Sequence, residues 1–300
     1  MTHDFRGCFV AMITPFTQDG VLDVDGLRQN VDWMIGEGVH GLIPLGSAGE
    51  FLQLSSDERA TLIETVVAAA AGRVPVIAGI SSDWTEEAAR WAKFVRDAGA
   101  DGVMAAPPFY SQPDEEEIVG HYAAIGEATD LPVMIYNNPA TTGIDLQPAM
   151  LARLSALPNM RYVKESTRDV RRIAQIHRLS EGRLRVFAGI HALESLRSGA
   201  VGWVSVPGNI LPGVSARLCV AAAEGRDAAA QEASDALWDI MELEDRTGKY
   251  VQLYKRALEL VGRPAGAPRA PRYRPSAQLE SELVTILESA QLLPRKAPAH

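Results

Sequence analysis

Cysteine is scarce in this sequence of 300 residues, which contains only Cys8 and Cys219. Two cysteines exclude a disulfide framework, although they still allow a single bridge. Basic residues are also in deficit, because 29 lysines and arginines are outnumbered by 38 aspartates and glutamates, leaving a formal net charge of -9. Domains that bind nucleic acid normally carry a basic surface, so this charge argues against nucleic acid as a partner.

Long hydrophobic runs are absent as well. No segment approaches the ~18 consecutive apolar residues of a membrane-spanning helix, and Met1–Arg6 lacks the pattern of a secretory signal. The six histidines are scattered, and the sequence has neither a Walker lysine loop nor a Gly-x-Gly-x-x-Gly turn. We therefore expect a cytoplasmic protein with no membrane partner, no metal site and no nucleotide cofactor.

Short, largely apolar runs alternate with longer segments of helical pattern, and eight such pairs can be read along the chain. The expected strands are 8–14, 41–45, 74–79, 102–106, 133–136, 161–164, 184–188 and 202–206. The expected helices between them are 23–37, 55–71, 85–98, 114–129, 147–156, 170–179, 191–198 and 211–224. Ser55 and Glu58 have the spacing of a capping box at the start of the second helix.

Eight such units within residues 1–225 fit a (β/α)8 TIM barrel, a fold that typically takes ~250 residues. An open α/β sheet with an unrecognised edge is the alternative. Beyond residue 225 the strand signal stops. We expect residues 226–300 to form a helical extension packed on the barrel, with helices over 228–261 and 276–293.

Lys164 is the most informative residue for chemistry, because barrel enzymes carry their active sites at the C-terminal ends of the strands. It ends the expected strand 161–164, where its amine points into the barrel mouth. A neutral amine there can attack a ketone and form a Schiff base, which permits carbon–carbon bond chemistry or β-elimination. The alternative is an ion pair with Glu165 or another carboxylate at the rim, and the residues alone leave the two interpretations balanced.

Three hydroxyl side chains near other strand ends fit a proton relay to Lys164. Tyr136 closes the preceding strand, whereas Ser47 and Tyr110 follow the second and fourth strands. A phenol can give a proton to the departing hydroxyl of a carbinolamine and take one back, if another hydroxyl links it with solvent. Taken singly, each tyrosine is more simply a core residue, so the argument rests on the combination.

The small-residue turn 46–49 offers backbone N–H groups that could meet a carboxylate. An isolated turn of this kind more often reflects a need for positive φ. It is not a nucleophile elbow, because Leu45 stands where that motif requires glycine.

Six motifs stand in order at the expected strand ends. They are Thr14-Pro15-Phe16, Gly46-Ser47-Ala48-Gly49-Glu50, Pro108-Phe109-Tyr110, Tyr136-Asn137-Asn138-Pro139, Lys164-Glu165-Ser166 and Gly189. Together they resemble the dihydrodipicolinate synthase / N-acetylneuraminate lyase family of Schiff-base barrel enzymes over nearly the whole chain.

The resemblance implies that Lys164 forms the Schiff base with pyruvate or another 2-keto acid and that Tyr136 is the acid/base beside it. Ser47 and the backbone of Ala48 would hold the keto acid's carboxylate. Tyr110 would complete the relay, commonly in a neighbouring subunit's site, which implies a homotetramer built as a dimer of dimers. No metal or organic cofactor is implied. The expected substrate-binding residues are Ala48, Gly49, Thr141, Thr142, Gly189 and Val206.

Two departures from the family pattern bear on the substrate. Members that condense pyruvate with aspartate semialdehyde usually carry a Thr-Thr pair where this chain has Ser47-Ala48, and an arginine where it has Thr141. A threonine cannot form that arginine's bidentate ion pair with a carboxylate. We therefore expect a lyase or aldolase acting on a 2-keto-3-deoxy sugar acid or a 4-hydroxy-2-oxoglutarate type of substrate. The alternatives are 4-hydroxy-tetrahydrodipicolinate synthase activity and a non-catalytic barrel that binds keto acids.

Overall fold

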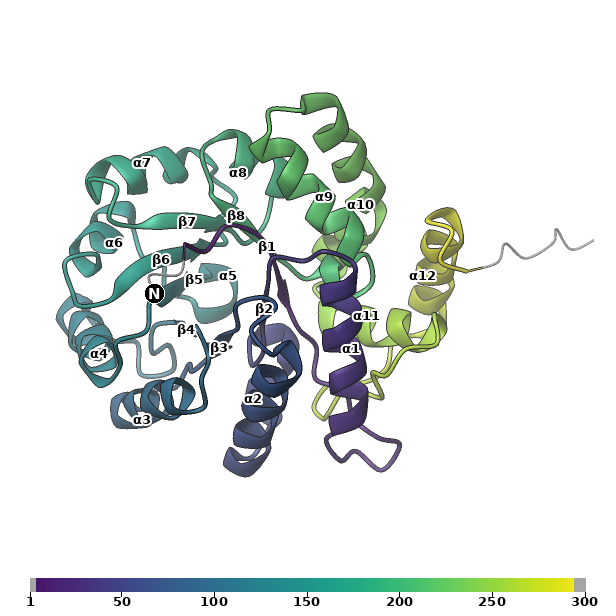
Figure 1. The fold of residues 1–300 in the computed structure, drawn as a ribbon, viewed down its shortest axis with the longest axis horizontal. Coiled ribbons are helices and arrows are strands. Elements are labelled where there is room, and N and C mark those ends of the chain that lie inside the picture. Colours follow the sequence, from purple (N-terminus) through teal and green to yellow (C-terminus); the bar gives the residue numbers. More distant parts are fainter. Residues whose placement is uncertain (1–3, 294–300) are drawn as a thin grey trace, which may run out of the picture.

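Eight short, almost fully buried strands form the centre of the computed structural model, which describes residues 4–293 (Figure 1). They are β1 (Gly7–Ala11), β2 (Gly41–Ile43), β3 (Ile77–Gly79), β4 (Gly102–Ala105), β5 (Val133–Asn137), β6 (Met160–Glu165), β7 (Arg185–Ala188) and β8 (Gly202–Ser205). Each overlaps one of the strands expected from the sequence.

The strands close into a barrel. Their order is β2-β1-β8-β7-β6-β5-β4-β3, and every neighbouring pair is parallel. Between the remaining edges, the Leu42 N–H donates to the Pro75 carbonyl at 3.0 Å and the Gly79 N–H donates to the Pro44 carbonyl at 2.9 Å. The predicted (β/α)8 barrel is thereby confirmed, and the open sheet is excluded.

Large side chains from alternate strand positions fill the barrel interior. Phe9, Met134, Tyr162 and Phe187 are all buried there, and the Phe9 and Phe187 rings meet edge to face at 5.3 Å. The opposite faces of the same strands pack against the surrounding helices. Both faces are thus apolar, which explains why the strand sequences are nearly continuous hydrophobic runs.

The helices that follow the strands form the outer ring (Figure 1). They are α1 (Val24–Gly36), α2 (Ser56–Ala70), α3 (Thr85–Asp97), α4 (Glu115–Ala128), α6 (Pro148–Leu154), α7 (Arg171–Leu179), α8 (Ala192–Arg197) and α9 (Pro212–Ala223). The capping box predicted at Ser55 and Glu58 is confirmed, because each side chain accepts the other's backbone N–H. The single turn α5 (Pro139–Thr142) after β5 is not predicted from the sequence.

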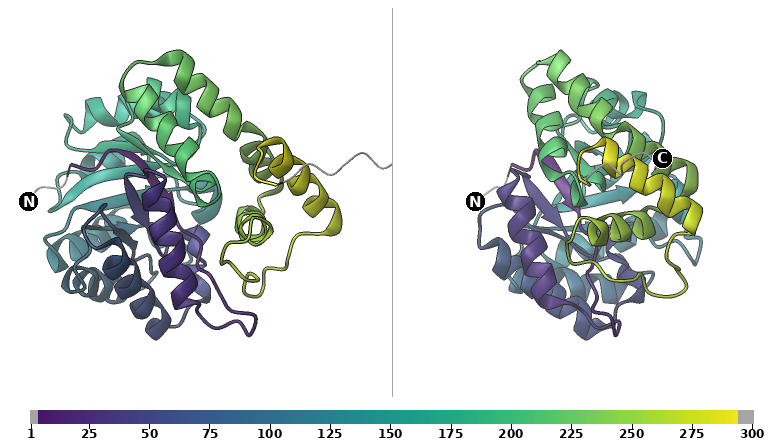
Figure 2. Two further views of the ribbon diagram at one scale, coloured as in Figure 1. Left: turned by 45° about the vertical axis from the view of Figure 1, so that its right-hand side comes forward. Right: turned by 90° about the vertical axis from the view of Figure 1, so that its right-hand side faces the viewer.

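Three further helices, α10 (Asp227–Thr247), α11 (Tyr250–Leu260) and α12 (Ala277–Ser289), follow the barrel. Gly248, at a φ of 63°, ends α10 and divides the region expected to be helical over 228–261. Figure 2 shows these green-to-yellow helices stacked on one side of the barrel. Leu253, Leu258, Leu283 and Leu287 are buried between them. Residues 294–300 of the predicted extension lie outside the described residues.

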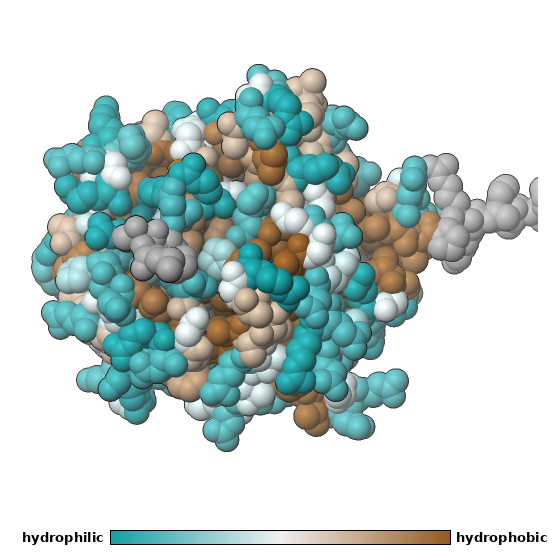
Figure 3. All heavy atoms as spheres, viewed as in Figure 1, coloured by the Kyte–Doolittle hydropathy of each residue, from teal (hydrophilic) through white to brown (hydrophobic). Residues whose placement is uncertain are grey.

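Hydrophilic residues cover most of the face shown in Figure 3, whereas apolar ones gather at its right edge over α12. Within residues 4–293, no helix is long and apolar enough to cross a membrane. Cys8 and Cys219 are free thiols buried in one apolar cluster behind β1 and β8.

Candidate active site

Lys164 and Tyr136 lie side by side near the C-terminal ends of β6 and β5, whose pairing sets the two residues opposite each other. Both side chains are buried, and the Lys164 Nζ is 4.1 Å from the centre of the Tyr136 ring. Because both residues occupy the inward-facing positions of their strands, they reach the same cavity at the barrel mouth. The structure thus brings together the lysine and the tyrosine on which the sequence argument rested.

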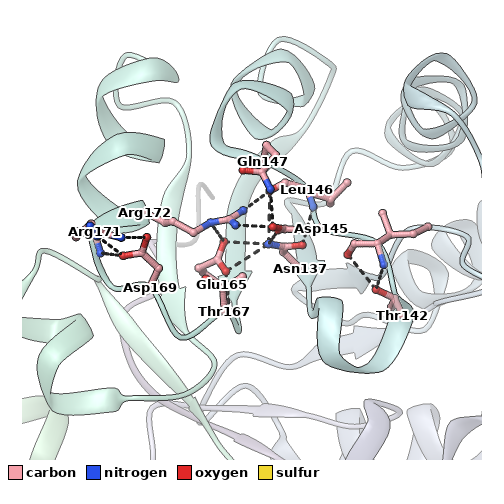
Figure 4. Close-up of polar contacts among 11 residues, drawn as sticks. Asn137, Thr142, Asp145, Leu146, Gln147, Glu165, Thr167, Asp169, Arg171 and Arg172 are labelled. Atoms are coloured by element: carbon pink, nitrogen blue, oxygen red, sulfur yellow. Dashed lines mark hydrogen bonds and ion pairs between the residues drawn. The ribbon is translucent and has the colours of Figure 1, made fainter.

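Glu165 points away from that cavity, because successive residues of a strand face opposite sides. Its carboxylate accepts hydrogen bonds from Asn137 Nδ2 at 3.1 Å and from the Thr167 backbone N–H at 2.8 Å, and Arg172 Nε lies 3.6 Å away (Figure 4). Within residues 4–293 no carboxylate forms an ion pair with Lys164. The Lys164 amine therefore remains available to a substrate.

Arg172 ties the segment after β5 to β6 (Figure 4). Its guanidinium donates to Asp145 Oδ2 at 2.9 Å and to the Leu146 carbonyl at 2.6 Å, while the Leu146 N–H donates to Asn137 Oδ1 at 3.0 Å. Arg172 and Asn137 are buried, so these bonds are shielded from water and from salt. This network holds the ends of β5 and β6 in register beneath Lys164 and Tyr136.

The Tyr136 phenol lies in an environment that favours proton transfer. Burial raises its pKa, but the charge on Lys164 and hydrogen bonds from Asn138, Lys164 and Ser47 outweigh that effect, so the pKa is lowered overall. The Asn138 Nδ2 donates to the phenol oxygen at 2.8 Å. A phenol with a lowered pKa loses its proton more readily, as an acid/base group must.

The turn after β2 carries Ser47 and Ala48 into the cavity as the start of a 3-10 turn, Ser47–Gly49. The first N–H groups of a helical turn have no hydrogen-bond partner within the turn. The N–H groups of Ser47 and Ala48 can therefore donate hydrogen bonds to a carboxylate. The Gly49 N–H, in contrast, donates to the Gly46 carbonyl at 2.9 Å, and Gly49 does not line the cavity. Gly49 therefore stabilises the turn and does not face the cavity.

The cavity around Lys164 has a volume of about 670 Å³. Gly189 and Val206 line it, as expected. A Cβ on Gly189 would lie 1.8 Å from Ser166 Oγ, so only glycine allows the loops after β6 and β7 to approach this closely. Ser166 and Thr167 line the same wall.

Besides Gly49, three more predicted site residues lie outside the cavity lining. Thr142 Oγ1 donates to the Asn138 and Ile144 carbonyls, at 3.0 and 3.1 Å, and Thr141 Oγ1 accepts from Asn138 Nδ2 at 2.9 Å. Both threonines stabilise the α5 turn, a role that a local hydroxyl often takes. Tyr110 is 86% exposed, and within this chain it does not reach Lys164.

Several residues that line the cavity are not predicted from the sequence. Arg168 and Asp169 follow β6 directly, a position that could have been searched because barrel sites use those loops. Glu244, Asp245 and Tyr250 come from α10 and α11, and no local signal links them to the barrel mouth. Their positions follow only from the packing of the C-terminal helices.

Comparison with known proteins agrees with this geometry. The model of the Dihydrodipicolinate synthetase family matches residues 4–290. A 4-hydroxy-tetrahydrodipicolinate synthase of Rhodospirillum centenum is 40% identical over 223 residues, which are 74% of this chain and 76% of that protein.

Two solved structures carry pyruvate. The dihydrodipicolinate synthase of Acinetobacter baumannii superposes with a TM-score of 0.91 at 30% identity, covering 96% of this chain and 99% of that one. A prophage protein of Escherichia coli K12 from the same family has a TM-score of 0.91 at 30% identity, covering 97% and 100%. The resemblance of the strand-end motifs is thus confirmed over the whole barrel and its extension, and the chain belongs to the dihydrodipicolinate synthetase family of Schiff-base lyases.

Proposed function

We propose that Lys164 forms a Schiff base with pyruvate or a related 2-keto acid and that Tyr136 is its acid/base partner. One observation carries the proposal: a buried lysine with no ion-pair partner within residues 4–293 faces a tyrosine and a cavity lined with hydroxyl groups. Ser47 and the backbone of Ala48 would bind the carboxylate of the keto acid. Pyruvate bound to two structural neighbours supports this substrate class.

The proposed chemistry follows from the site's own residues. The Lys164 amine adds to the ketone carbon, and Tyr136 gives the proton with which the carbinolamine hydroxyl leaves as water. The Tyr136 phenolate then takes a proton from the neighbouring carbon, which converts the imine into an enamine nucleophile. Attack of the enamine on an aldehyde then forms the new carbon–carbon bond, and the reverse sequence cleaves it. This route uses neither a metal nor an organic cofactor.

The first candidate for the second substrate is aspartate semialdehyde. Relatives that match most of this chain are named 4-hydroxy-tetrahydrodipicolinate synthase, which supports our alternative interpretation better than the sugar-acid one. The second candidate is a hydroxylated tail, such as that of a 2-keto-3-deoxy sugar acid or 4-hydroxy-2-oxoglutarate. Thr141 in place of an arginine favours it, as does the serine Ser166 on the cavity wall.

A substrate panel separates the two candidates. Pyruvate with aspartate semialdehyde is assayed by coupling to the following reductase, and cleavage of 2-keto-3-deoxygluconate and 4-hydroxy-2-oxoglutarate is assayed by pyruvate release. If the protein is the synthase, we expect its kcat/KM for aspartate semialdehyde to be at least about 100-fold higher than for either hydroxylated acid. This ratio corresponds to about 2.8 kcal/mol of transition-state stabilisation. Preference for a hydroxylated acid would reverse the assignment.

We also propose that the protein acts in the cytoplasm as a homotetramer, a dimer of dimers in which Tyr110 enters the partner's site. The phenol of Tyr110 is exposed, and the Tyr110 backbone N–H is held by a hydrogen bond to Asp83. This arrangement supports a role for the side chain outside its own chain. Two free buried thiols suit a reducing compartment.

Mixed oligomers test the shared site. We expect Tyr110→Phe to lower kcat by ~10²-fold or more, the scale of a lost acid/base group, and Lys164→Ala to be inactive. Refolding the two variants together restores activity if Tyr110 crosses the interface, because one site of each mixed pair then holds both native residues. No recovery, with sedimentation showing mixed oligomers, contradicts the proposal. Tyr273→Phe, which alters another exposed phenol, is the matched control.

A further inference from the structure

Four acidic side chains line the cavity around Lys164, and three of them are neutralised by arginines. Asp145 pairs with Arg172, Asp169 with Arg171, and Asp245 with Arg168. The fourth, Glu244, forms no ion pair within residues 4–293. Within this described range, Glu244 therefore has no paired arginine that would stabilise its ionised form.

Glu244 lies one turn before the end of α10 and is partly buried. Its Oε2 accepts a hydrogen bond from the buried Tyr254 hydroxyl at 2.8 Å. Within the described residues its Oε1 has no hydrogen-bond partner, although Glu244 lines the cavity. The bond to Tyr254 orients the carboxyl group and leaves one oxygen free to meet a ligand.

Charged and titratable groups on several neighbouring elements surround Glu244. The pKa of Glu244 is raised to about 7, because burial, together with the charge on Asp245, raises it more than the Tyr254 hydrogen bond and the charge on Lys164 lower it. On α11, Tyr250 faces it, with a pKa that burial raises to about 12, so this phenol remains neutral. His191 and Glu242 share a smaller adjoining cavity with it. A carboxyl group that titrates near neutral pH is suited to both giving and taking a proton.

We propose that Glu244 is a second acid/base group of this site, which protonates the carbonyl oxygen of the aldehyde substrate. As the enamine carbon bonds to the aldehyde carbon, the carbonyl π electrons pass to oxygen, and Glu244 gives that oxygen its proton. The product carries a hydroxyl group, and the Glu244 carboxylate regains a proton from water. In the cleavage direction the carboxylate removes the proton of the same hydroxyl. This role rests on the proposed Schiff base at Lys164 and divides the proton transfers between two groups.

The test compares Glu244→Gln and Tyr254→Phe with the parent enzyme between pH 5.5 and 9. Two rates are measured: borohydride trapping of pyruvate, and turnover of whichever of the three panel substrates the parent accepts. We expect Glu244→Gln to lower kcat by about 100-fold and to lose the titration near pH 7, with pyruvate trapping unchanged within twofold. Tyr254→Phe should keep the titration but shift it to higher pH. In the parent the Tyr254 hydrogen bond lowers the pKa of Glu244, so removing this bond raises that pKa.

Three outcomes overturn the proposal. The first is a Glu244→Gln variant with the kcat and pH profile of the parent, and the second is an unshifted profile in Tyr254→Phe. The third is a parent that traps pyruvate but turns over none of the three substrates, since no aldehyde oxygen then needs a proton. Should Glu244→Gln misfold, Tyr254→Phe alone decides. Failure of the parent to trap pyruvate contradicts the proposed Schiff base, and this result differs from each outcome that contradicts the role of Glu244. Glu232→Gln, an exposed residue of the same helix, is the matched control.

Discussion

Replacing Lys164 by alanine is expected to abolish covalent capture of pyruvate and to lower turnover by at least about 10³-fold, since no other group can form the imine. The fold should persist. Lys164 forms no ion pair within residues 4–293, and its amine faces a cavity rather than the packed core, so truncation leaves no charge unpaired. Intact-mass measurement after incubation with pyruvate and borohydride, followed by peptide mapping, shows whether the adduct forms and where.

Lys93→Ala is the matched control, because it removes an exposed lysine from α3 far along the chain from the strand ends. It should trap pyruvate as the parent does. An adduct that persists in Lys164→Ala would place the chemistry on another amine. Loss of the adduct together with loss of the far-ultraviolet circular dichroism spectrum would show that Lys164 is needed for folding, and Lys164→Met would then test the chemistry in a variant of similar volume.

The sequence predicted the barrel because its constraints are local. A strand buried on both faces must be short and apolar, and a helix that covers it must repeat its apolar positions every three or four residues. Lys164 and Tyr136 stood out because a polar residue at the end of such a strand is unusual. Strand alternation then determines which way each side chain points, as the opposite directions of Lys164 and Glu165 illustrate.

The remaining site residues depend on tertiary packing. Tyr250 reaches the cavity because Gly248 ends α10 and redirects the chain into α11, whereas Glu244 reaches it from the last turn of α10. Thr141 and Thr142 have the right chemistry for a substrate hydroxyl, but the turn after β5 uses their side chains for its own hydrogen bonds. A sequence pattern identifies the residue type at a loop, whereas the loop's conformation decides whether that residue faces the substrate.

The second large effect concerns Lys255, which joins the C-terminal helices to the turn that carries Ser47 and Ala48. Its Nζ donates to Glu50 Oε1 at 2.8 Å and to the Thr14 carbonyl at 2.9 Å, and it lies 4.0 Å from the centre of the Phe16 ring. Neither side chain of the Lys255–Glu50 pair is more than 1% exposed. Glu50 follows Ser47–Gly49 with a φ of 55°, so the pair holds a strained residue of the turn in place.

We expect Lys255→Met to lower the free energy of unfolding by about 3–5 kcal/mol, because it leaves the Glu50 carboxylate buried without its cation. Urea unfolding at pH 7, followed by circular dichroism, measures the loss, and Lys249→Met at an exposed position is the control. The double variant Glu50→Gln/Lys255→Met should recover part of the stability, since the buried charge is gone. It should nevertheless bind pyruvate more weakly than the parent, because the turn that carries Ser47 and Ala48 has lost its anchor. Equal pyruvate affinity in the double variant and the parent would show that the turn keeps its shape without the pair, and the Lys255–Glu50 contact would then serve stability alone.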